Sequence, residues 1–594
     1  MSSAILGINC HAHDSSVALI QDGRIVFAAA EERFSRTRKD RRFPHAAIRA
    51  ALTHADLQPA ELTAVAFGWN RPGLGPLHTI RAALAGELPR SRGWTTDQLV
   101  HLASEVRRGG GVRPFEKEFG PLDRGRAFFI DHHEAHAWSS YALSGFDDAL
   151  VLVMDGWGAW QSTTIYHAQG ERLRPLRTFR YPNSLGVLYE SFTDLLGFER
   201  NSDEWKVMGL AAYGQPTVPL QDWIQVTREG YRVNGRLLSG RSYGDLSALT
   251  RRFGARRDPE TFIAEGDRDL AASVQQATEA AIFALVRAGL RRTGSRRVCL
   301  AGGVAMNSKA NGRLLASGLV DALFVQPAAT DDGTAIGAAL AAHARLGQPI
   351  PRYRLREVYL GPAYSDDELA QTLQAYQLRA LRVPQIEEAV AALLAQGHIV
   401  GWFQGRMEFG PRALGNRSIL ADPRRPEMKD RVNASVKFRE GWRPFAPACL
   451  AEAAPEYFDG CQDAPFMIVT FTVRPDKRAA IPAVTHADGT ARVQTVREPD
   501  NPRFWRLLRA FGRRTGVPVL LNTSFNLRGE PIVCSPKDAI RTFYSSGLDF
   551  LALGSFLIPK DPLWEHLAPY ALGRVSQNGV SEADVVIGPP LARG

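Results

Sequence analysis

Hydrophobic and polar positions repeat one pattern of strands and loops along the N-terminal half. Residues 4–28 predict an apolar strand, a loop rich in His and Asp, a second strand, a turn at 21–23 and a third strand. Residues 149–170 repeat it, with an apolar strand running into small residues after Asp155 and a further strand over Ser162–His167. The repetition predicts two related lobes.

A third apolar run, Val298–Ala301, stops at Gly302 and Gly303 before a helix is expected to begin near Asn307. The N-terminus of a helix carries free N–H groups and a partial positive charge, so a nucleotide or phosphate can bind there. A simple turn between strand and helix is the alternative interpretation.

A Pro-rich connector over 347–354 follows an alanine-rich helix and predicts the main domain boundary. We expect domains over 1–350 and 351–570, and a loosely packed tail over 571–594 that is poor in large apolar residues. Residues 71–124 predict two amphipathic helices inserted in the first lobe, serving either as solvated scaffold or as a wall of an acceptor pocket.

In the second domain, the sequence predicts a helix over 386–396 and a strand over 398–403. An arginine-rich stretch follows. Eight arginines lie between Arg406 and Arg443, interleaved with Gly, Pro and Phe that fix the backbone, and a merely solvated face would normally mix in more Asp and Glu. This favours ligand binding over a solvated surface. Fixed arginines, a lysine and a Ser-x-Asn pair suit a small phosphorylated anion beside a nucleotide: Arg412, Lys437, Arg439, Arg443, Ser524 and Asn526.

A histidine cluster predicts a metal site. His132 and His136 are four residues apart, so a helix places both on one face. Asp331, on a loop before the next helix, offers a carboxylate. Two histidines and one carboxylate suit Fe(II) or another borderline divalent ion and leave positions open for a phosphate. The alternative is that the histidines only fill or cap a helix.

Composition limits the broad class of protein. The chain has 594 residues, is 45% hydrophobic and has no apolar run long enough for a bilayer, which predicts a cytoplasmic protein of two or three domains. Five scattered cysteines predict reduced, mostly buried thiols. The net charge of +10 fits nucleic acid, but equally an enzyme that binds ATP and a second phosphate.

Taken together, the motifs resemble the O-carbamoyltransferases of the nodulation-factor and antibiotic-tailoring family, over nearly the whole chain. The motifs that carry the resemblance are His13-Asp14-Ser15, Glu31-Glu32-Arg33-Phe34-Ser35-Arg36 with Lys39, Asp131-His132-His133-x-x-His136, Met208-Gly209-Leu-Ala-Ala-Tyr213-Gly214 and Gly410-Pro-Arg412-Ala-Leu-Gly-Asn-Arg417-Ser.

The resemblance implies an α/β fold with two parts. The first is a duplicated actin-like (ASKHA) ATPase-type domain, similar to the metal-dependent subunit that transfers threonylcarbamoyl groups to tRNA. The second is a YrdC-like α/β domain that forms an acyl adenylate, and Lys437-x-Arg439 with Ser524-x-Asn526 matches its phosphate-binding and nucleotide-binding signature.

For the second domain, the resemblance implies that carbamoyl phosphate and ATP, with Mg²⁺ as an option, give carbamoyl-AMP. Arg412, Lys437 and Arg443 would clamp carbamoyl phosphate and neutralise the leaving phosphate. Arg439, Arg492, Ser524 and Asn526 would complete the site.

For the first domain, the resemblance implies transfer of the carbamoyl group to an alcohol, with His132, His136 and Asp331 holding the metal, most simply Fe(II). His13 is the candidate general base, since a neutral imidazole suits that task near pH 7; alternatively it only binds a phosphate or a carbonyl. Lys39 could bind the same phosphate. Asp14, Gly156, Lys206, Gly302, Gly303 and Asn307 would line the nucleotide cleft.

The acceptor is expected to be a hydroxyl of a small natural product, such as an antibiotic, sugar, polyketide or toxin, with no nucleic acid or membrane partner. A tRNA-modifying enzyme is the alternative, although no RNA platform of interleaved aromatics and lysines is evident. A non-catalytic Hsp70-like switch would have no use for the histidines or the arginine-rich motif. The oligomeric state stays open, a homodimer being one option.

Overall fold

The computed structural model describes residues 3–10, 13–70, 109–158, 160–238, 244–560 and 585–586. It divides into an N-terminal unit, Met1–Ser35 with Lys39–Leu355, and a C-terminal unit, Arg36–Arg38 with Arg356–Gly594. Most of the expected insertion at 71–124 and nearly all of the expected tail at 571–594 lie outside the described residues. Among the described helices, none is both long and apolar enough to cross a membrane.

The first lobe of the N-terminal unit is built on a five-stranded sheet in the order β3-β2-β1-β4-β5. β2 pairs antiparallel with β1 on one side and, through the turn at Asp22 and Gly23, with β3 on the other. On the far side of β1, β4 and then β5 continue the sheet in parallel. Its strands are β1 (Ala4–Asn9), β2 (Ser16–Gln21), β3 (Arg24–Ala30), β4 (Ala64–Phe67) and β5 (Ala127–Phe129).

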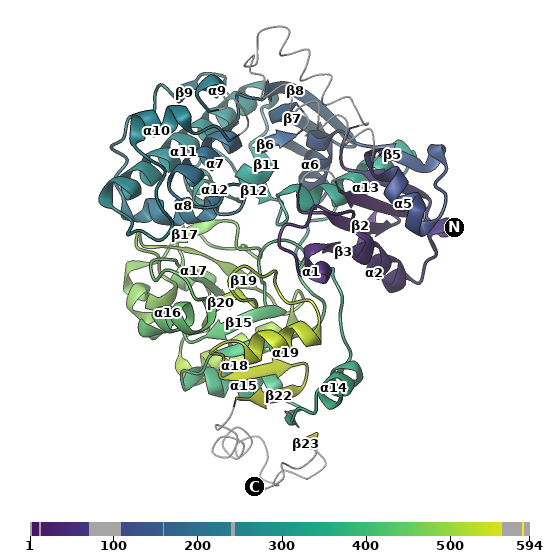
Figure 1. The fold of residues 1–594 in the computed structure, drawn as a ribbon, viewed down its shortest axis with the longest axis vertical. Coiled ribbons are helices and arrows are strands. Elements are labelled where there is room, and N and C mark those ends of the chain that lie inside the picture. Colours follow the sequence, from purple (N-terminus) through teal and green to yellow (C-terminus); the bar gives the residue numbers. More distant parts are fainter. Residues whose placement is uncertain are drawn as a thin grey trace. The chain divides into compact units, whose positions relative to one another are not determined.

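The second lobe repeats this sheet. Its order is β12-β11-β6-β7-β8, with β6 to β8 antiparallel and β11 and β12 parallel to β6, so each strand has a counterpart in the first lobe (Figure 1). This confirms the predicted duplication and is the arrangement of an actin-like fold. The strands are β6 (Asp148–Gly158), β7 (Gln161–Gln169), β8 (Arg172–Arg180), β11 (Arg297–Ala301) and β12 (Ala322–Val325).

Helices of the N-terminal unit cover these sheets, and two of them cross unusually closely. A Cβ added to Gly337 of α13 would lie 1.7 Å from the carbonyl oxygen of Ala135 in α6, and one added to Gly7 of β1 would lie 1.9 Å from that of Ala335. Both positions therefore exclude a side chain, which locks α6 onto α13 and α13 onto β1. The helices include α1 (Glu32–Ser35), α2 (His45–Ala55), α5 (Val112–Phe119), α6 (His132–Tyr141), α7 (Leu185–Leu195), α8 (Glu204–Leu210), α10 (Ser247–Phe253), α11 (Glu265–Thr293), α12 (Ser308–Ala316) and α13 (Thr334–Arg345).

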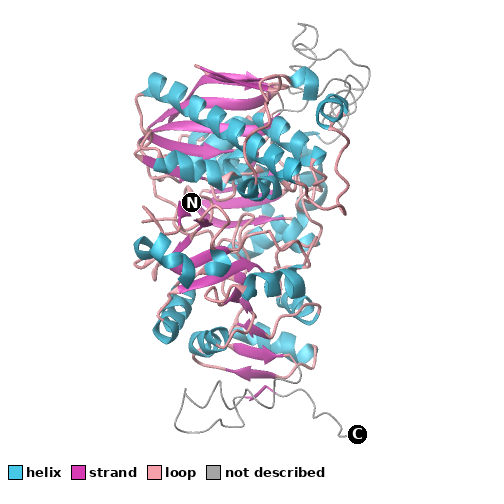
Figure 2. Cartoon of the chain, turned by 90° about the vertical axis from the view of Figure 1, so that its left-hand side faces the viewer, coloured by secondary structure: helices cyan, strands magenta, loops and turns pink. Residues whose placement is uncertain are grey.

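The C-terminal unit contains a mixed nine-stranded sheet in the order β19-β16-β20-β15-β14-β21-β22-β13-β23. Helices lie on either side of the strands of this unit (Figure 2). The strands are β13 (Ala380–Arg382), β14 (Val400–Phe403), β15 (Arg417–Ala421), β16 (Ala446–Leu450), β19 (Gln494–Val496), β20 (Val519–Ser524), β21 (Phe550–Leu553), β22 (Phe556–Pro559) and β23 (Val585–Val586), with β17 (Thr470–Thr472) and β18 (Thr490–Arg492) as a separate pair.

The core of the C-terminal unit lies between this sheet and two helices. Trp402, Phe504 and Phe511 are fully buried there, and the indole N–H of Trp402 donates to the Gly415 carbonyl at 2.8 Å. Burial of such aromatic side chains is a main stabilising term for a unit of this size. These two helices are α15 (Ile386–Ala395) and α18 (Pro502–Thr515). The unit also contains α14 (Asp366–Ala375), α16 (Glu427–Val432), α17 (Ala454–Tyr457) and α19 (Pro536–Tyr544).

Candidate functional site

Four buried side chains of the N-terminal unit meet in a cluster that can hold a metal ion. They are His132 and His136 on α6, Asp155 in β6, and Asp331 just before α13, and one ligand atom from each lies within 4.8 Å of all the others. The structure thus brings together the three sequence candidates, His132, His136 and Asp331, and adds Asp155.

The separations in this cluster fit a cation. His132 Nε2 lies 3.2 Å from His136 Nε2, 3.1 Å from Asp155 Oδ2 and 3.5 Å from Asp331 Oδ1. Ligands bound tetrahedrally at about 2.1 Å from one ion lie about 3.4 Å apart. Two imidazoles and two carboxylates are ligands for Fe(II), Zn²⁺, Mn²⁺ and related ions.

Surrounding groups orient the ligands. Nδ1 of His132 lies 3.3 Å from the carbonyl oxygen of Gly68, a contact that leaves the Nε2 lone pair for a metal. Oδ1 of Asp155 accepts from the backbone N–H groups of Gly156 at 2.9 Å and Gly303 at 3.3 Å, so Oδ2 faces His132. The backbone N–H groups of these two glycines thus orient the Asp155 carboxylate, and the expected place of both glycines in a nucleotide cleft stays a prediction.

Charges in the cluster are strongly coupled. Burial alone would lower the pKa of His132, but Asp331 and Asp155 raise it to about 10. Burial alone would likewise raise the pKa of Asp331, but His13 and His132 hold it well below its usual range. The fold thus buries the carboxylates of Asp155 and Asp331 side by side, and their negative charge must be compensated by protons on the histidines or by a metal ion.

His13 lies at the edge of this cluster. Its Nδ1 is 2.9 Å from Asp14 Oδ2 and 3.9 Å from Asp331 Oδ2. Burial would lower the pKa of His13, but Asp331 and Asp14 raise it to about 9. Asn9 donates to the carbonyls of His13 and Asp14 at 3.1 and 3.0 Å and so fixes this loop.

The other residues expected near a nucleotide have structural partners. Lys39, at a φ of 53°, donates from Nζ to the Asn201 carbonyl. Its positive charge contributes a lowering of the pKa values of His13 and Asp14. Lys206 Nζ pairs with Asp203 Oδ2 at 2.8 Å.

The strand-to-helix turn near Asn307 is also well packed. Oδ1 of Asn307 accepts from the N–H of Ala310 at 3.0 Å and from Gln275 at 2.9 Å. Gly302, at a φ of 87°, would place a Cβ 2.3 Å from the carbonyl oxygen of Met154. Only glycine fits there.

In the C-terminal unit, Lys437, Ser524 and Asn526 come together although the lysine is far from the other two in sequence. Lys437 Nζ donates to Ser524 Oγ at 3.2 Å and to Asn526 Oδ1 at 2.9 Å, and Ser524 Oγ donates to Asn526 Oδ1 at 2.6 Å. Burial, Arg439 and Arg443 lower the pKa of Lys437 well below its usual range.

Arginines extend this cluster of positive charge. Burial and Arg443 lower the pKa of Arg439 to about 9, and burial lowers that of Arg412 to about 10. Burial, Arg412 and Arg439 hold the pKa of Arg492 well below its usual range. Among the described residues, no hydrogen-bond partner exists for the buried Nε of Arg412 or of Arg492. We call Arg412, Lys437, Arg439, Arg443 and Arg492 the cationic cluster; it is arranged to receive an anion.

Neighbouring arginines have structural roles instead. Arg417 is fully buried and lies over the Phe403 ring at 3.7 Å, and it donates to backbone carbonyls that include those of Asn416 and Gly405. Arg424 pairs with the buried Asp422 at 2.7 Å. Only part of the arginine-rich stretch therefore faces the cationic cluster.

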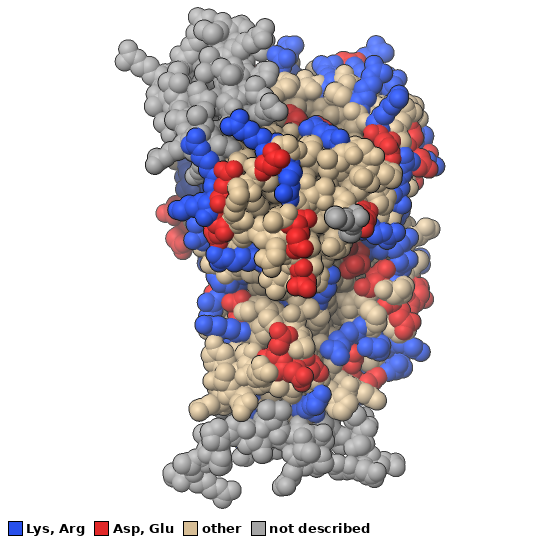
Figure 3. Space-filling view, turned by 90° about the vertical axis from the view of Figure 1, so that its right-hand side faces the viewer, with Lys and Arg blue, Asp and Glu red and all other residues tan. Residues whose placement is uncertain are grey.

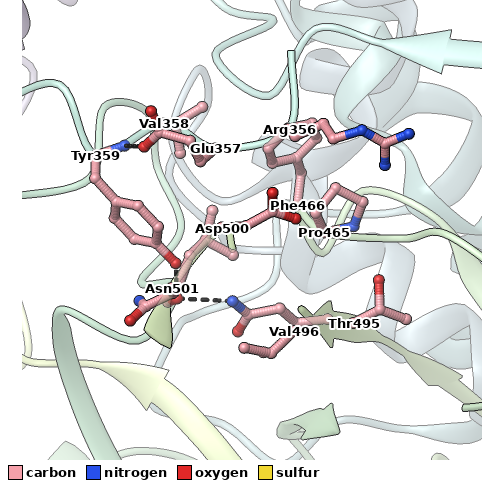
Figure 4. A pocket seen from close by; sticks show the side chains of 12 residues that line it. Arg356, Glu357, Val358, Tyr359, Pro465, Phe466, Thr495, Val496, Asp500 and Asn501 are labelled. Carbon is pink, nitrogen blue, oxygen red and sulfur yellow. Dashed lines mark hydrogen bonds between the residues drawn. The ribbon is translucent and has the colours of Figure 1, made fainter. Parts of the chain in front are cut away.

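A small pocket is lined by Leu414 and Gln494, each two residues along the chain from a member of the cluster, Arg412 and Arg492 (Figure 4). Tyr359 and Gln494 both donate to the carbonyl of Leu414 at 2.7 Å. The cavity volume of about 10 Å³ has room for about one water molecule. The pocket is therefore too small for a substrate such as ATP, and the two bonds to Leu414 hold the chain just after Arg412.

On the face shown in Figure 3, basic and acidic side chains are interspersed over the described surface of both units. The described part of that face carries charges of both signs and no continuous basic stripe of the kind that binds nucleic acid.

Two family models match this chain. Residues 4–71 and 113–340 match the family "Carbamoyltransferase N-terminus", and residues 391–560 match "Carbamoyltransferase C-terminus". The cationic cluster lies in the second matched region and the candidate metal ligands in the first.

Similar proteins cover most of the chain. "Nodulation protein NolNO" of Sinorhizobium fredii is 41% identical over 93% of this chain and 80% of its own. "Nodulation protein NolO" of Bradyrhizobium diazoefficiens is 45% identical over 74% of this chain and 82% of its own. Among solved structures, HypF of T. kodakarensis aligns with 58% of this chain and 48% of its own, at 12% identity and a TM-score of 0.32. The chain belongs to the carbamoyltransferase family and is a carbamoyltransferase enzyme.

Proposed function

We propose that the chain is an ATP-dependent O-carbamoyltransferase that carries out two reactions in one polypeptide. In the first, carbamoyl phosphate, ATP and water give carbamoyl-AMP, pyrophosphate and phosphate. In the second, the hydroxyl of an acceptor attacks the carbamoyl carbon, AMP leaves, and the hydroxyl proton is released. Adenylation makes the carbamoyl group reactive because AMP is a good leaving group.

The observation that carries the proposal is the cationic cluster. Burial and mutual repulsion of its positive charges destabilise the ligand-free folded protein, and a bound phosphate dianion would offset both effects. Arg412 and Arg492, whose Nε atoms are unsatisfied, would bind phosphate oxygens, and Lys437 would neutralise charge on the leaving phosphate. Ser524 and Asn526 would orient Lys437 and contact the nucleotide. We assign the first reaction to this YrdC-like unit.

We assign the second reaction to the N-terminal unit. A divalent metal held by His132, His136, Asp155 and Asp331 would supply a Lewis acid that stabilises the charge on departing AMP. Fe(II) suits this mixed nitrogen and oxygen ligand set. His13, 3.9 Å from Asp331, would accept the acceptor's hydroxyl proton once a metal ion on Asp331 offsets the carboxylate charge that raises the pKa of His13. Lys39 and Lys206 would contact phosphate. The acceptor would be a small natural product, such as a sugar or an antibiotic.

Separating the two reactions by mutation tests the proposal. Lys437→Met should abolish pyrophosphate release from ATP and carbamoyl phosphate. Asp331→Asn should keep that release but fail to carbamoylate an acceptor, scored as a mass increase in a panel of hydroxylated metabolites. Loss of pyrophosphate release in Asp331→Asn, with metal-free wild type still releasing it, would contradict the division of labour.

A further inference from the structure

Phe438 is a bulky aromatic residue held in an unfavourable conformation at the surface of the C-terminal unit. Its φ of 47° and ψ of 55° lie in the left-handed region, which is costly for a large side chain. The side chain is nevertheless 49% exposed, so burial does not repay that cost. Strain of this kind at one residue is a reason to look for a function.

The backbone conformation of Phe438 shapes the cationic cluster. The residue ends a short π-helix, Asn433–Lys437, and the N–H groups of Phe438 and Arg439 both donate to the Asn433 carbonyl. In a continuing helix, residues two apart point to different faces. Here the chain reverses at Phe438, and Lys437 and Arg439 are close enough for the charge of Arg439 to lower the pKa of Lys437. Both residues thus belong to the cationic cluster.

The backbone alone does not explain why the residue is phenylalanine. Glycine is the usual residue in a left-handed position at the end of a helix, where it bears no strain. Arg439 already has its own aromatic partner, since its guanidinium lies over the buried Phe445 ring at 4.5 Å. Phe438 stands between Lys437 and Arg439 in the sequence, and an exposed ring next to side chains that would bind phosphate is suited to a flat apolar group attached to a phosphate.

We propose that Phe438 is the stacking platform for the purine base of ATP, an inference that rests on the proposed binding of nucleotide phosphates at the cationic cluster. Each base stacked on an aromatic side chain contributes binding equivalent to about tenfold or more in affinity. The charged groups would then bind the phosphates, and the exposed ring would bind the base and so distinguish ATP from other polyphosphates.

Tripolyphosphate, which has the phosphates of ATP but no base, provides the test. Binding of ATP and of tripolyphosphate to the full chain would be measured by calorimetry, and any ATP binding that survives in Lys437→Met would be subtracted as belonging elsewhere. In the wild type, ATP should bind about tenfold more tightly than tripolyphosphate. In Phe438→Gly, which keeps the left-handed backbone, the two affinities should become equal, and Phe438→Trp should keep the preference for ATP.

Two results would overturn the inference. Equal affinities in the wild type would mean that the base is not bound, and a preference for ATP that persists in Phe438→Gly would place base binding elsewhere. The thermal shift caused by carbamoyl phosphate should be the same in wild type and Phe438→Gly, which shows that the cationic cluster is intact. Failure to form carbamoyl-AMP would contradict the proposed reaction but not this binding preference, so the two failures can be told apart.

Discussion

Replacing Arg412 with glutamine should stabilise the ligand-free protein and abolish its response to phosphate. Burial lowers the pKa of Arg412 to about 10, whereas an isolated arginine titrates above about 12. One pKa unit corresponds to about 1.4 kcal/mol, so the charge costs the folded state about 3 kcal/mol. Because the folded pKa is the lower one, this cost is complete at neutral pH and disappears only as the pH rises above about 10.

Loss of the packed arginine side chain offsets part of that gain, so we expect a net increase of about 1 to 2 kcal/mol in the free energy of unfolding. For a unit of this size, that is a rise of about 2 to 8 °C in melting temperature. Carbamoyl phosphate at 100 times its Kd should stabilise the wild type by about 2.7 kcal/mol and the variant by much less. Differential scanning calorimetry with and without carbamoyl phosphate measures both effects.

Arg424→Gln is the matched control, because Arg424 pairs with the buried Asp422 at 2.7 Å. Its loss removes the nearest cation of a buried carboxylate and leaves the more distant Arg425 at 3.8 Å, so this variant should melt at a lower temperature and keep the full response to carbamoyl phosphate. The reasoning is refuted if Arg412→Gln melts below the wild type without ligand, or if it keeps the full response.

Three further substitutions test the two sites. Gly158→Ala would place a Cβ 2.5 Å from Cδ2 of His132, so metal affinity should fall about tenfold or more. The control Gly266→Ala adds its Cβ in open space and should leave metal affinity unchanged. A wild-type metal content in Gly158→Ala would argue against the cluster as the metal site. Lys437→Met should slow formation of carbamoyl-AMP by about 100-fold or more, and a normal rate would remove it from the site. His13→Asn should form the adenylate but not transfer the carbamoyl group, whereas equal damage to both steps would exclude it as the base.

Much of the fold of the N-terminal unit could be predicted because its signals are local. Alternating apolar runs and the turn at 21–23 define each lobe within about 25 residues, and the same pattern recurs at 149–170. The spacing of His132 and His136 places both on one helical face for the same reason. The order of strands in the C-terminal sheet was not predicted, because its pairings join segments far apart in sequence, such as β15 with β20.

The candidate sites depend more on tertiary contacts. Asp155 was noted only as the end of a strand, and it becomes a candidate ligand because β6 ends beside α6. One signal was available, since Asp155 is the charged residue that ends a buried apolar run. Composition likewise could not separate Arg412 from Arg417, because the difference is tertiary: both terminal nitrogens of Arg417 donate to backbone carbonyls that only the folded chain brings together.

Mass spectrometry of the purified enzyme with ATP, carbamoyl phosphate and Fe(II), without any acceptor, tests the central claim most directly. The proposed division of labour predicts carbamoyl-AMP and an equal amount of pyrophosphate in the wild type, and neither product in Lys437→Met. If neither appears in the wild type while both substrates and the metal are shown to bind, the claim that the cationic cluster forms carbamoyl-AMP is contradicted.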